Sequence, residues 1–282
     1  MPELPEAEVA ARQLRERLVG GMIRDYWVGR DDIVREGLPT LPWYRSSRVE
    51  GVERWGKSVV LACRRGAERR YLVAELGMTG LLLLPSAPFK HPQHTHFRIL
   101  FDGCAEQEVR YWNPRRFGRL SLLDQNGLDQ YTGRRFGYDP LGMTFEEFKN
   151  LLQGNRSRLK SLLMRQQAIA GIGNIYANEI LFRAKLHPNQ IANEMQAGRL
   201  PLLYEAMQLI LHEAIALGGS SVRDYFAPDG TEGQYKRRHL VYAKAGLPCP
   251  NRCGALIRRS VGERTSFYCP SCQRIRQQTT KK

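Results

Sequence analysis

No part of the chain approaches the roughly 18 consecutive apolar residues that a membrane-spanning helix needs. The first residues also lack the basic region and apolar stretch of a secretory signal, because two carboxylates, Glu3 and Glu6, stand there instead. Together these absences predict a soluble, intracellular protein located in the cytoplasm.

Acidic residues are scarce relative to basic ones. The chain has 28 Asp and Glu against 43 Lys and Arg, which gives a formal net charge of +15. Such an excess indicates a polyanionic partner, and nucleic acid is the leading candidate because neutralising phosphates releases counterions. A solvated basic surface is the alternative. The segment 113–118 (Asn-Pro-Arg-Arg-Phe-Gly) favours binding, because its arginines stand beside glycine and an aromatic ring.

Cysteine is also scarce, with six residues that are unevenly placed. Cys63 and Cys104 are isolated in strand-like stretches and are expected to be small core residues. The other four form two close pairs near the C-terminus, Cys249 with Cys253 and Cys269 with Cys272. In a cytosolic chain this spacing predicts a structural zinc ion held by four thiolates, with iron as the alternative.

Hydrophobic periodicity predicts a change of architecture along the chain. Residues 5–19 have the apolar stripe of a helix, which the pair Gly20-Gly21 ends. Segments rich in β-branched and aromatic residues then predict an antiparallel sandwich or barrel. They are 22–28, 47–55, 57–63, 71–76, 80–84, 96–101, 108–112 and 118–123. Helical patterns follow at 144–152, around 159–163, at 175–185 and at 201–217, whereas 218–235 is predicted to be a mobile loop.

The first six residues carry a possible nucleophile. Removal of Met1 would leave Pro2 with a secondary amine that is partly unprotonated near neutral pH, because α-amino groups titrate near ~8. Such an amine can attack a masked aldehyde carbon such as C1′ of a sugar, and Glu3 and Glu6 supply nearby acids. The alternative is structural: Pro5 begins the helix, and the carboxylates complement its dipole. The local sequence leaves both interpretations open.

Two further features gain weight only from the basic charge of the chain. Gly171 and Gly173 precede a helix, and backbone N–H groups at a glycine-rich helix start bind phosphate well. A tight turn between packed helices is the alternative. Lys57 follows Trp55-Gly56, a predicted hairpin tip, where a lysine is most often a solvated charge.

Five motifs in order give the chain a resemblance to the formamidopyrimidine-DNA glycosylases, within the larger group that includes the endonuclease VIII type. They are residues 2–6 (Pro-Glu-Leu-Pro-Glu), 76–80 (Leu-Gly-Met-Thr-Gly), 113–118, 171–177 (Gly-Ile-Gly-Asn-Ile-Tyr-Ala) and the four C-terminal cysteines. Leu4 favours the formamidopyrimidine type. The resemblance implies a bifunctional, bacterial-type and nucleoid-associated DNA repair enzyme that excises oxidised purines and cuts the strand by β,δ-elimination.

The resemblance also implies roles for individual residues. In the catalytic set, Pro2 is the Schiff-base nucleophile, Glu3 assists opening of the sugar ring, and Lys57 lies near the lesion phosphate, with Glu6 beside them. Arg115 faces the orphaned base and Phe117 acts as a wedge. The complete set of expected DNA contacts is Met78, His94, Arg115, Phe117, Lys160, Asn174, Arg223 and Arg264. The implied partner is damaged double-stranded DNA, bound by a monomer that holds one structural Zn²⁺ and no small-molecule cofactor.

The resemblance completes the predicted fold class, an α+β multidomain protein. An N-terminal β-sandwich with an N-terminal helix (2–124) is joined by a linker (125–142) to a helix-two-turn-helix domain (143–234), a zinc-finger module (235–276) and a tail (277–282). Three departures from the family pattern are visible: three residues between the first two cysteines instead of two, Asn113 where Asp is common, and Arg223 where Lys is frequent. An oxidised-pyrimidine glycosylase and a non-catalytic, zinc-dependent DNA-binding protein are the alternative functions.

Overall fold

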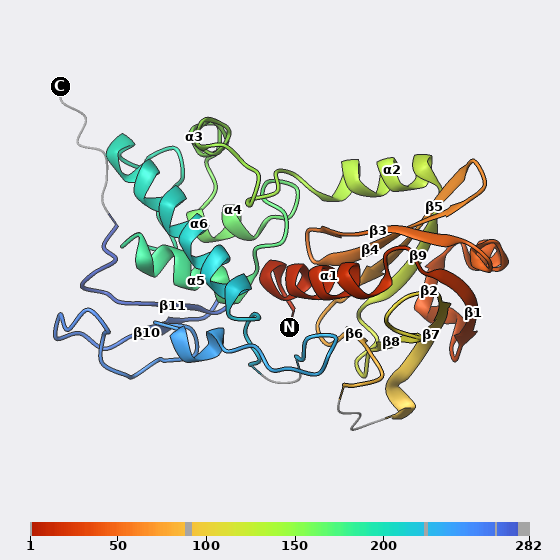
Figure 1. Cartoon of the computed structure of the whole chain (residues 1–282). Helices are drawn as coiled ribbons and strands as arrows, with labels where there is room; N and C mark the ends of the chain where they lie inside the picture. Colours follow the sequence, from red (N-terminus) through yellow and green to blue (C-terminus); the bar gives the residue numbers. More distant parts are fainter. Residues whose placement is uncertain (1, 88–91, 223–224, 263, 276–282) are drawn as a thin grey trace. The chain divides into compact units, whose positions relative to one another are not determined.

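The computed structural model describes residues 2–87, 92–222, 225–262 and 264–275, and the chain divides into two compact units (Figure 1). The first unit comprises Met1–Arg135 and Ala214–Lys236, and the second comprises Phe136–Glu213 and Arg237–Lys282. The first unit is therefore discontinuous in sequence, because the chain leaves it after Arg135 and returns at Ala214.

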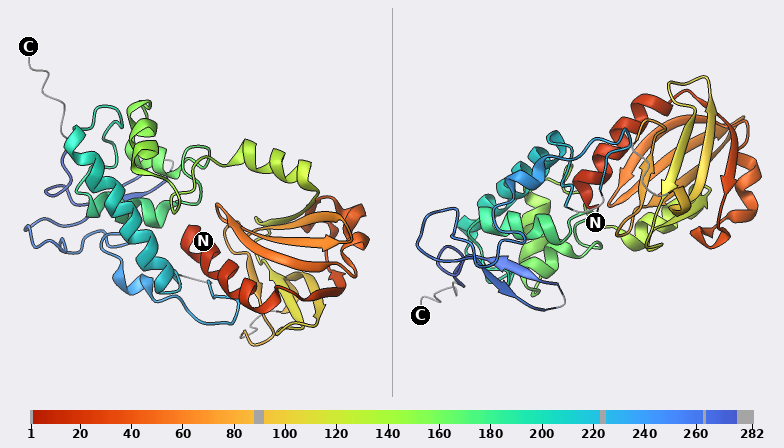
Figure 2. Two further views of the ribbon diagram at one scale, coloured as in Figure 1. Left: turned by 45° about the horizontal axis from the view of Figure 1, so that its top comes forward. Right: turned by 90° about the horizontal axis from the view of Figure 1, so that it is seen from below.

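The N-terminal helix, α1 (Leu4–Leu18), forms where the sequence predicted it. Proline stands in its first turn, and Glu3 and Glu6 form a capping box at its start. Its buried stripe contains several alanines, whose small side chains allow α1 to lie close against strands β3 and β4 (Figure 2). Gly20, at a φ of 89°, then turns the chain away in a conformation that glycine adopts without strain.

Among the described residues of the first unit, nine strands follow, and they confirm all eight predicted strand segments. They are β1 (Met22–Val28), β2 (Val34–Glu36), β3 (Arg48–Trp55), β4 (Ser58–Arg65), β5 (Glu68–Glu75), β6 (Leu81–Leu83), β7 (Thr95–Asp102), β8 (Glu108–Trp112) and β9 (Arg119–Leu123). Their hydrogen-bonded order is β2-β9-β5-β4-β3-β1-β7-β8-β6, and every pairing except the parallel β2–β9 is antiparallel. The β1–β3 pairing joins Met22 to Arg48 and forms the corner between two layers.

The two layers enclose one hydrophobic core. Val52, Leu61 and Leu72 come from the β3–β5 layer, Phe97 and Phe101 come from β7, and all are at most 2 % exposed. The apolar stripe of α1 closes this core. Because the helix that carries the predicted nucleophile is part of the core, its N-terminus is held by the packing of the whole sandwich instead of fraying as most termini do.

The second unit is mainly helical, with α3 (Phe145–Gln153), α4 (Leu159–Met164), α5 (Asn174–Arg183) and most of α6 (Leu200–Ala216). Thr144 and Glu147 form the predicted capping box of α3. A hairpin of β10 (Arg258–Ser260) and β11 (Ser266–Tyr268) carries the cysteine cluster, and Phe182 of α5 packs against Val241 and Ile257 beside it. Helices followed by a cysteine-bearing hairpin confirm the predicted fold class of the C-terminal part.

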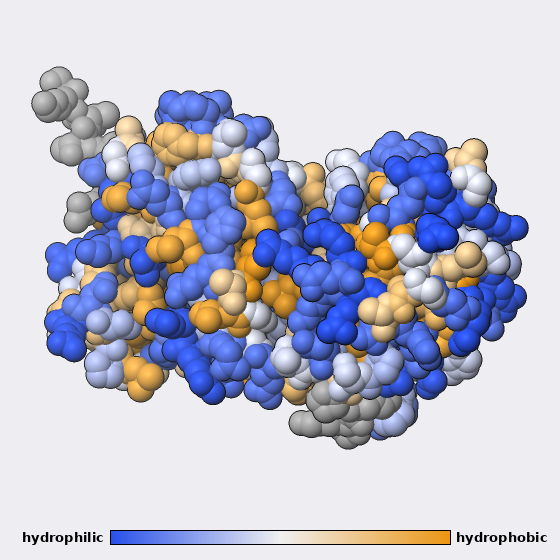
Figure 3. Space-filling model, in the orientation of Figure 1, coloured by the Kyte–Doolittle hydropathy of each residue, from blue (hydrophilic) through white to orange (hydrophobic). Residues whose placement is uncertain are grey.

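The compact units differ from the predicted domain boundaries in two places. The segment predicted as a linker contains a helix, α2 (Gln125–Arg135), which buries Leu128 and Tyr131. Residues 214–236, assigned to the helical domain from the sequence, group with the first unit. Hydrophilic residues cover most of the face seen in Figure 3. Within the described residues, no helix combines the length and apolarity that a membrane crossing requires.

Candidate functional site

Three predicted catalytic residues lie within the first six positions, just before or at the start of α1, and all are buried. Pro2 is buried, and Glu3 and Glu6 are each 0 % exposed. The Glu6 carboxylate accepts the backbone N–H of Glu3 through Oε2 at 2.7 Å and that of Ser220 through Oε1, also at 2.7 Å. Pro2 is thus followed in the chain by two carboxyl groups that are shielded from bulk water, and carboxyl groups can serve as general acids or bases.

Described residues on both sides of positions 223–224 pack onto α1 from the segment 218–235. The hydroxyl of Tyr225 donates to the backbone oxygen of Glu6 at 3.1 Å, and the side-chain amide of Gln13 donates to Asp229 at 3.1 Å. Tyr225 is 3 % exposed in an apolar cluster with Leu81. The predicted mobility therefore does not describe these residues, because their polar groups find partners on α1 and their apolar groups find partners on the sandwich. Arg223, a predicted DNA contact, lies outside the described residues.

A glycine permits the close approach of this segment to Glu6. Gly219 has a φ of 82°, and a Cβ atom built there would lie 2.9 Å from Glu6 Oε1. Any side chain at this position would push against the carboxylate and would also strain the backbone. The contact between this segment and α1 thus depends on a glycine that the sequence-based reasoning placed only in a predicted mobile loop.

A buried ion pair connects α1 to the hairpin tip that carries Lys57. Arg54 on β3 is 5 % exposed in its side chain; its Nε donates to Glu8 of α1 at 2.8 Å, and its Nη1 donates to the backbone oxygen of Gly56 at 3.4 Å. Burial opposes ionisation of Glu8, but hydrogen bonds from Arg12 and Arg54 outweigh it and lower the pKa of Glu8. The sequence-based reasoning missed Arg54, because nothing in the sequence distinguishes it from the other arginines.

Asn113 organises the loop that bears Arg115 and Phe117. Its Oδ1 accepts from Thr79 Oγ1 at 3.2 Å and from the backbone N–H of Arg116 at 3.1 Å. Its Nδ2 donates to the hydroxyl of Tyr111 and to the backbone oxygen of Gly118, both at 3.2 Å. Asn113 is 0 % exposed. Because two of these bonds need an amide donor, the departure from Asp at this position suits the surroundings in this chain.

Two glycines bring the Met78 turn against this loop. A Cβ atom at Gly77 would lie 2.5 Å from the backbone nitrogen of Gly118, and a Cβ at Gly118 would lie 2.2 Å from the backbone oxygen of Glu75. Gly77 also has a φ of 59°. The backbones of the two motifs 76–80 and 113–118 are therefore in direct contact, which explains why both contain glycine.

Arg115 and Phe117 point outward from these two loops. Phe117 is 53 % exposed, and the guanidinium of Arg115 lies over its ring at 5.0 Å from the centroid. Met78 is half-buried. His94 lies at the base of the loop, where its carbonyl accepts the N–H of Asn113 at 2.9 Å. An exposed phenylalanine stacked with an arginine is the kind of surface that inserts into or stacks on bases.

The second unit places the remaining predicted DNA contacts near one another. Asn174 is the first residue of α5, whose N-terminus carries the positive end of the helix dipole. Asn178 of the same helix donates to the backbone oxygen of Asn174 at 2.6 Å and accepts from the backbone N–H of Phe267 on β11 at 2.8 Å. Arg264 is exposed in the loop between β10 and β11. The Lys160 ammonium donates to the backbone oxygen of Thr265 at 2.6 Å.

The four cysteines fit one zinc ion. Their sulfur atoms all lie within 4.8 Å of one another, with 3.8 Å between Cys249 and Cys272 and 3.5 Å between Cys253 and Cys269. Zn–S bonds of about 2.3 Å in a tetrahedron place sulfur atoms about 3.8 Å apart. The extra residue between the first two cysteines is accommodated at Arg252, which has a φ of 53°. The prediction of one structural zinc ion held by four thiolates is confirmed at the level of the ligand set.

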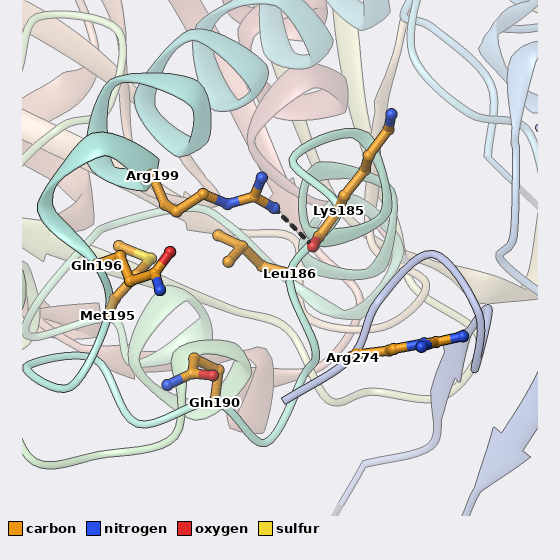
Figure 4. A pocket seen from close by; sticks show the side chains of 7 residues that line it. All are labelled: Lys185, Leu186, Gln190, Met195, Gln196, Arg199 and Arg274. Carbon is orange, nitrogen blue, oxygen red and sulfur yellow. Dashed lines mark hydrogen bonds between the residues drawn. The ribbon is translucent and has the colours of Figure 1, made fainter. Parts of the chain in front are cut away.

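A pocket elsewhere in the second unit contains none of the predicted site residues. It is lined by Lys185, Leu186, Gln190, Met195, Gln196, Arg199 and Arg274 (Figure 4). Arg199 crosses it and donates to the backbone oxygens of Ala184 and Lys185 at 2.9 and 2.8 Å, which caps the end of α5. The charged ends of Lys185 and Arg274 extend in different directions in Figure 4, so they form no convergent anion site.

Comparisons with known proteins agree with the motifs. The formamidopyrimidine-DNA glycosylase N-terminal domain matches residues 1–120, and the formamidopyrimidine-DNA glycosylase H2TH domain matches 136–225. The formamidopyrimidine-DNA glycosylase of Solibacter usitatus is 38 % identical and covers 97 % of this chain and 100 % of its own length.

Solved structures are similar over the same extent. The MutM (Fpg) protein of Thermus thermophilus aligns with a TM-score of 0.84 at 36 % identity, over 98 % of this chain and 100 % of its own. A Lactococcus lactis FPG mutant in complex with DNA containing Fapy-dG aligns with a TM-score of 0.84 at 31 % identity, over 97 % of this chain and 100 % of its own.

Proposed function

The chain belongs to the formamidopyrimidine-DNA glycosylase family, and on that premise we propose that it excises oxidised purines from duplex DNA and then cuts the strand at the abasic site. The substrates proposed are 8-oxoguanine and formamidopyrimidines. The solved complex of the Lactococcus lactis relative with Fapy-dG supports this substrate class. The observation that carries the proposal is the burial of Pro2 beside Glu3 and Glu6 at the start of α1.

In the proposed reaction, Pro2 is the nucleophile once Met1 has been removed. Its secondary amine attacks C1′ of the damaged nucleoside, the glycosidic bond breaks, and the base leaves with a proton. Glu3 donates a proton to the ring oxygen as the sugar opens, which leaves a cationic iminium between Pro2 and C1′. Proton loss at C2′ then begins the β,δ-elimination that releases the sugar from both phosphates.

Glu6 has a distinct part in this scheme. Both of its oxygens accept backbone N–H groups, one from Glu3 and one from Ser220. We therefore assign Glu6 to holding the nucleophile's helix turn and the 218–235 segment together, and Glu3 to the proton transfer.

The proposed DNA contacts fall into two groups. Met78, Arg115 and Phe117 fill the space that the extruded base leaves, since base chemistry requires the target nucleotide to leave the stack. Their support is the outward stack of Arg115 on Phe117 and the backbone contact between the two loops. Asn174 and Arg264 bind phosphates, and the position of Asn174 at a helix N-terminus supports its assignment. Lys57 and His94 stay predicted contacts near the lesion strand.

Borohydride trapping tests the nucleophile. The enzyme, with Met1 removal verified by mass, is mixed with a duplex that holds one 8-oxoguanine opposite cytosine, and the iminium is reduced in place. The expected product is a covalent adduct that peptide mapping assigns to Pro2. The matched control is the same chain with an uncleaved N-terminal extension, in which the Pro2 nitrogen is an amide and forms no Schiff base. An adduct on another residue, or an equal yield in the control, contradicts the assignment.

The alternative functions are separated by the same assay. A parallel duplex that carries an oxidised pyrimidine should be cut more slowly, and faster cutting of that duplex would instead favour the endonuclease VIII type. A protein that binds the 8-oxoguanine duplex tightly but gives neither excision nor adduct with Pro2 exposed would be a non-catalytic damaged-DNA-binding protein. We further propose that the enzyme acts as a monomer.

A further inference from the structure

Lys160 of α4 points into the second unit instead of toward solvent. Its residue exposure is 5 %, and its Nζ atom reaches the loop between β10 and β11. It donates to the backbone oxygen of Thr265 at 2.6 Å, to Ser266 Oγ at 3.0 Å and to the backbone oxygen of Arg264 at 3.5 Å. The partners of this ammonium thus come from three consecutive residues of the hairpin loop.

The number of acceptors decides what this lysine can do. An ammonium group has three N–H donors, and three acceptors on the hairpin lie within hydrogen-bonding distance of it. A phosphate oxygen that bound Lys160 would have to displace at least one of them and enter a site that is almost closed to solvent. Leaving a half-buried carbonyl oxygen without its donor carries a desolvation cost. The geometry therefore favours a lysine that is already engaged before DNA arrives.

A second side chain holds the same hairpin from α5. Asn178 is 0 % exposed and joins the backbone oxygen of Asn174 to the backbone N–H of Phe267 on β11. Lys160 and Asn178 thus hold successive residues of the hairpin, from Arg264 to Phe267, against α4 and α5. These two helices lie on either side of the turn that contains Gly171 and Gly173. The exposed side chain of Arg264 extends from a backbone that these helices fix in place.

We propose that Lys160 is a positioning residue: it fixes the backbone at Arg264 so that the guanidinium of Arg264 meets a DNA phosphate, and it does not itself bind phosphate. This inference rests on the proposed function, because it assumes that the hairpin contacts DNA. Lys160, which the resemblance implied to be a direct DNA contact, holds the hairpin loop to α4 instead.

A double-mutant cycle measured by salt dependence tests the proposal. The full-length, zinc-loaded protein is titrated with a duplex holding one tetrahydrofuran abasic site, from 50 to 200 mM salt. Each phosphate contact contributes about 0.9 to the slope of log affinity against log salt, or about 3.5-fold across this range. Arg264→Ala should lose one such contact. Lys160→Met should lose the same contact in the wild-type background and lose nothing further when Arg264 is already alanine.

Controls separate this coupling from loss of charge or of fold. Lys149→Met removes an exposed lysine of the same unit and should leave the slope unchanged. Ser266→Ala removes one acceptor of Lys160 without changing the charge. It should lower the salt slope when Arg264 is present and leave the slope unchanged when Arg264 is already alanine. This variant tests the contact between Lys160 and the hairpin even if Lys160→Met fails to fold. At saturating enzyme, the single-turnover excision rate of Lys149→Met and of Ser266→Ala should stay within about twofold of the wild-type rate, a readout that a general structural defect would change.

The outcomes are distinct. Slope losses of Lys160→Met and Arg264→Ala that add up in the double variant would show that each residue binds its own phosphate and would overturn the proposal. An unchanged slope in Arg264→Ala would also overturn it, because no contact would then be positioned. Wild-type protein that shows no salt-dependent binding to the duplex would instead refute the proposed function itself.

Discussion

Glu179 of α5 offers a sharp test of how the zinc-bearing part is attached to the helices. It is 0 % exposed; its Oε2 accepts the backbone N–H of Leu240 at 2.6 Å, and its Oε1 accepts those of Val241 and Tyr242 at 3.0 and 2.7 Å. The carboxylate therefore binds the chain segment that leads into the cysteine module. Replacing it with glutamine keeps the shape of the side chain and removes half of its acceptors.

The expected cost follows from these contacts. The amide oxygen of glutamine can keep the hydrogen bonds from the backbone N–H groups of Val241 and Tyr242. Its NH₂ group then faces the N–H of Leu240, so two donors meet in a buried site. Hydrogen bonds to a charged acceptor contribute roughly 1.5–3 kcal/mol and an orphaned buried donor costs roughly 1–3 kcal/mol, so Glu179→Gln should lower the free energy of unfolding by roughly 2.5–6 kcal/mol.

Chemical denaturation of wild-type and variant proteins at neutral pH measures this loss. Hydrogen exchange at residues 240–242 should show faster exchange of the same amides in the variant. The control is Glu213→Gln, because Glu213 is 35 % exposed in its side chain and lies 4.0 Å from Arg238, a pairing expected to contribute at most ~1 kcal/mol. A Glu179→Gln variant no less stable than Glu213→Gln would refute the argument that this carboxylate attaches the module.

Three further outcomes follow from the contacts described. Gly118→Ala, whose Cβ would lie 2.2 Å from a backbone oxygen, should destabilise the first unit by at least ~2 kcal/mol in denaturant titrations. Gly51→Ala, with nothing within 4 Å of its Cβ, should not. Hydrogen bonds from Arg12 and Arg54 outweigh burial and lower the pKa of Glu8 below its ordinary 4.5. The free energy of unfolding of the wild type should therefore exceed that of Glu8→Gln by its full amount above pH 4.5, and this difference should decline as the pH falls through the lowered pKa. A difference that does not change with pH would contradict the ion pair. Chelation of zinc should unfold the β10–β11 hairpin and weaken DNA binding, and retained affinity at zero zinc content would count against the role of the module.

The elements of the fold were predictable where side-chain pattern decides them. Richness in β-branched and aromatic residues located the strand segments, and the spacing of the apolar stripe located α1. The three-residue strand β2 was too short to show a pattern. Helix α2 was predicted as a linker because its glycines and charges resemble a loop, and only Leu128 and Tyr131 bury it.

The site was predictable as motifs but not as contacts. Glu8 and Arg54 are 46 residues apart, and Lys160 lies 105 residues before Thr265. No local signal shows that one arginine or one lysine among 43 basic residues turns inward, since burial depends on the tertiary packing of distant segments. Glycine positions such as Gly219 likewise gain their meaning only when the backbone or side chain that approaches them is known.

The discontinuity of the first unit has a consequence for biosynthesis. Gln13 emerges early from the ribosome, but its partner Asp229 is added more than 200 residues later. At about 5–20 residues per second, the interval from Arg135 to this point lasts roughly 5–20 s. During that time the sandwich must persist without its closing segment while the entire helical bundle is made. An isolated 1–135 fragment, or a chain that ends before Ser220, therefore lacks the contacts that Ser220, Tyr225 and Asp229 make with α1, the helix that begins beside the proposed nucleophile.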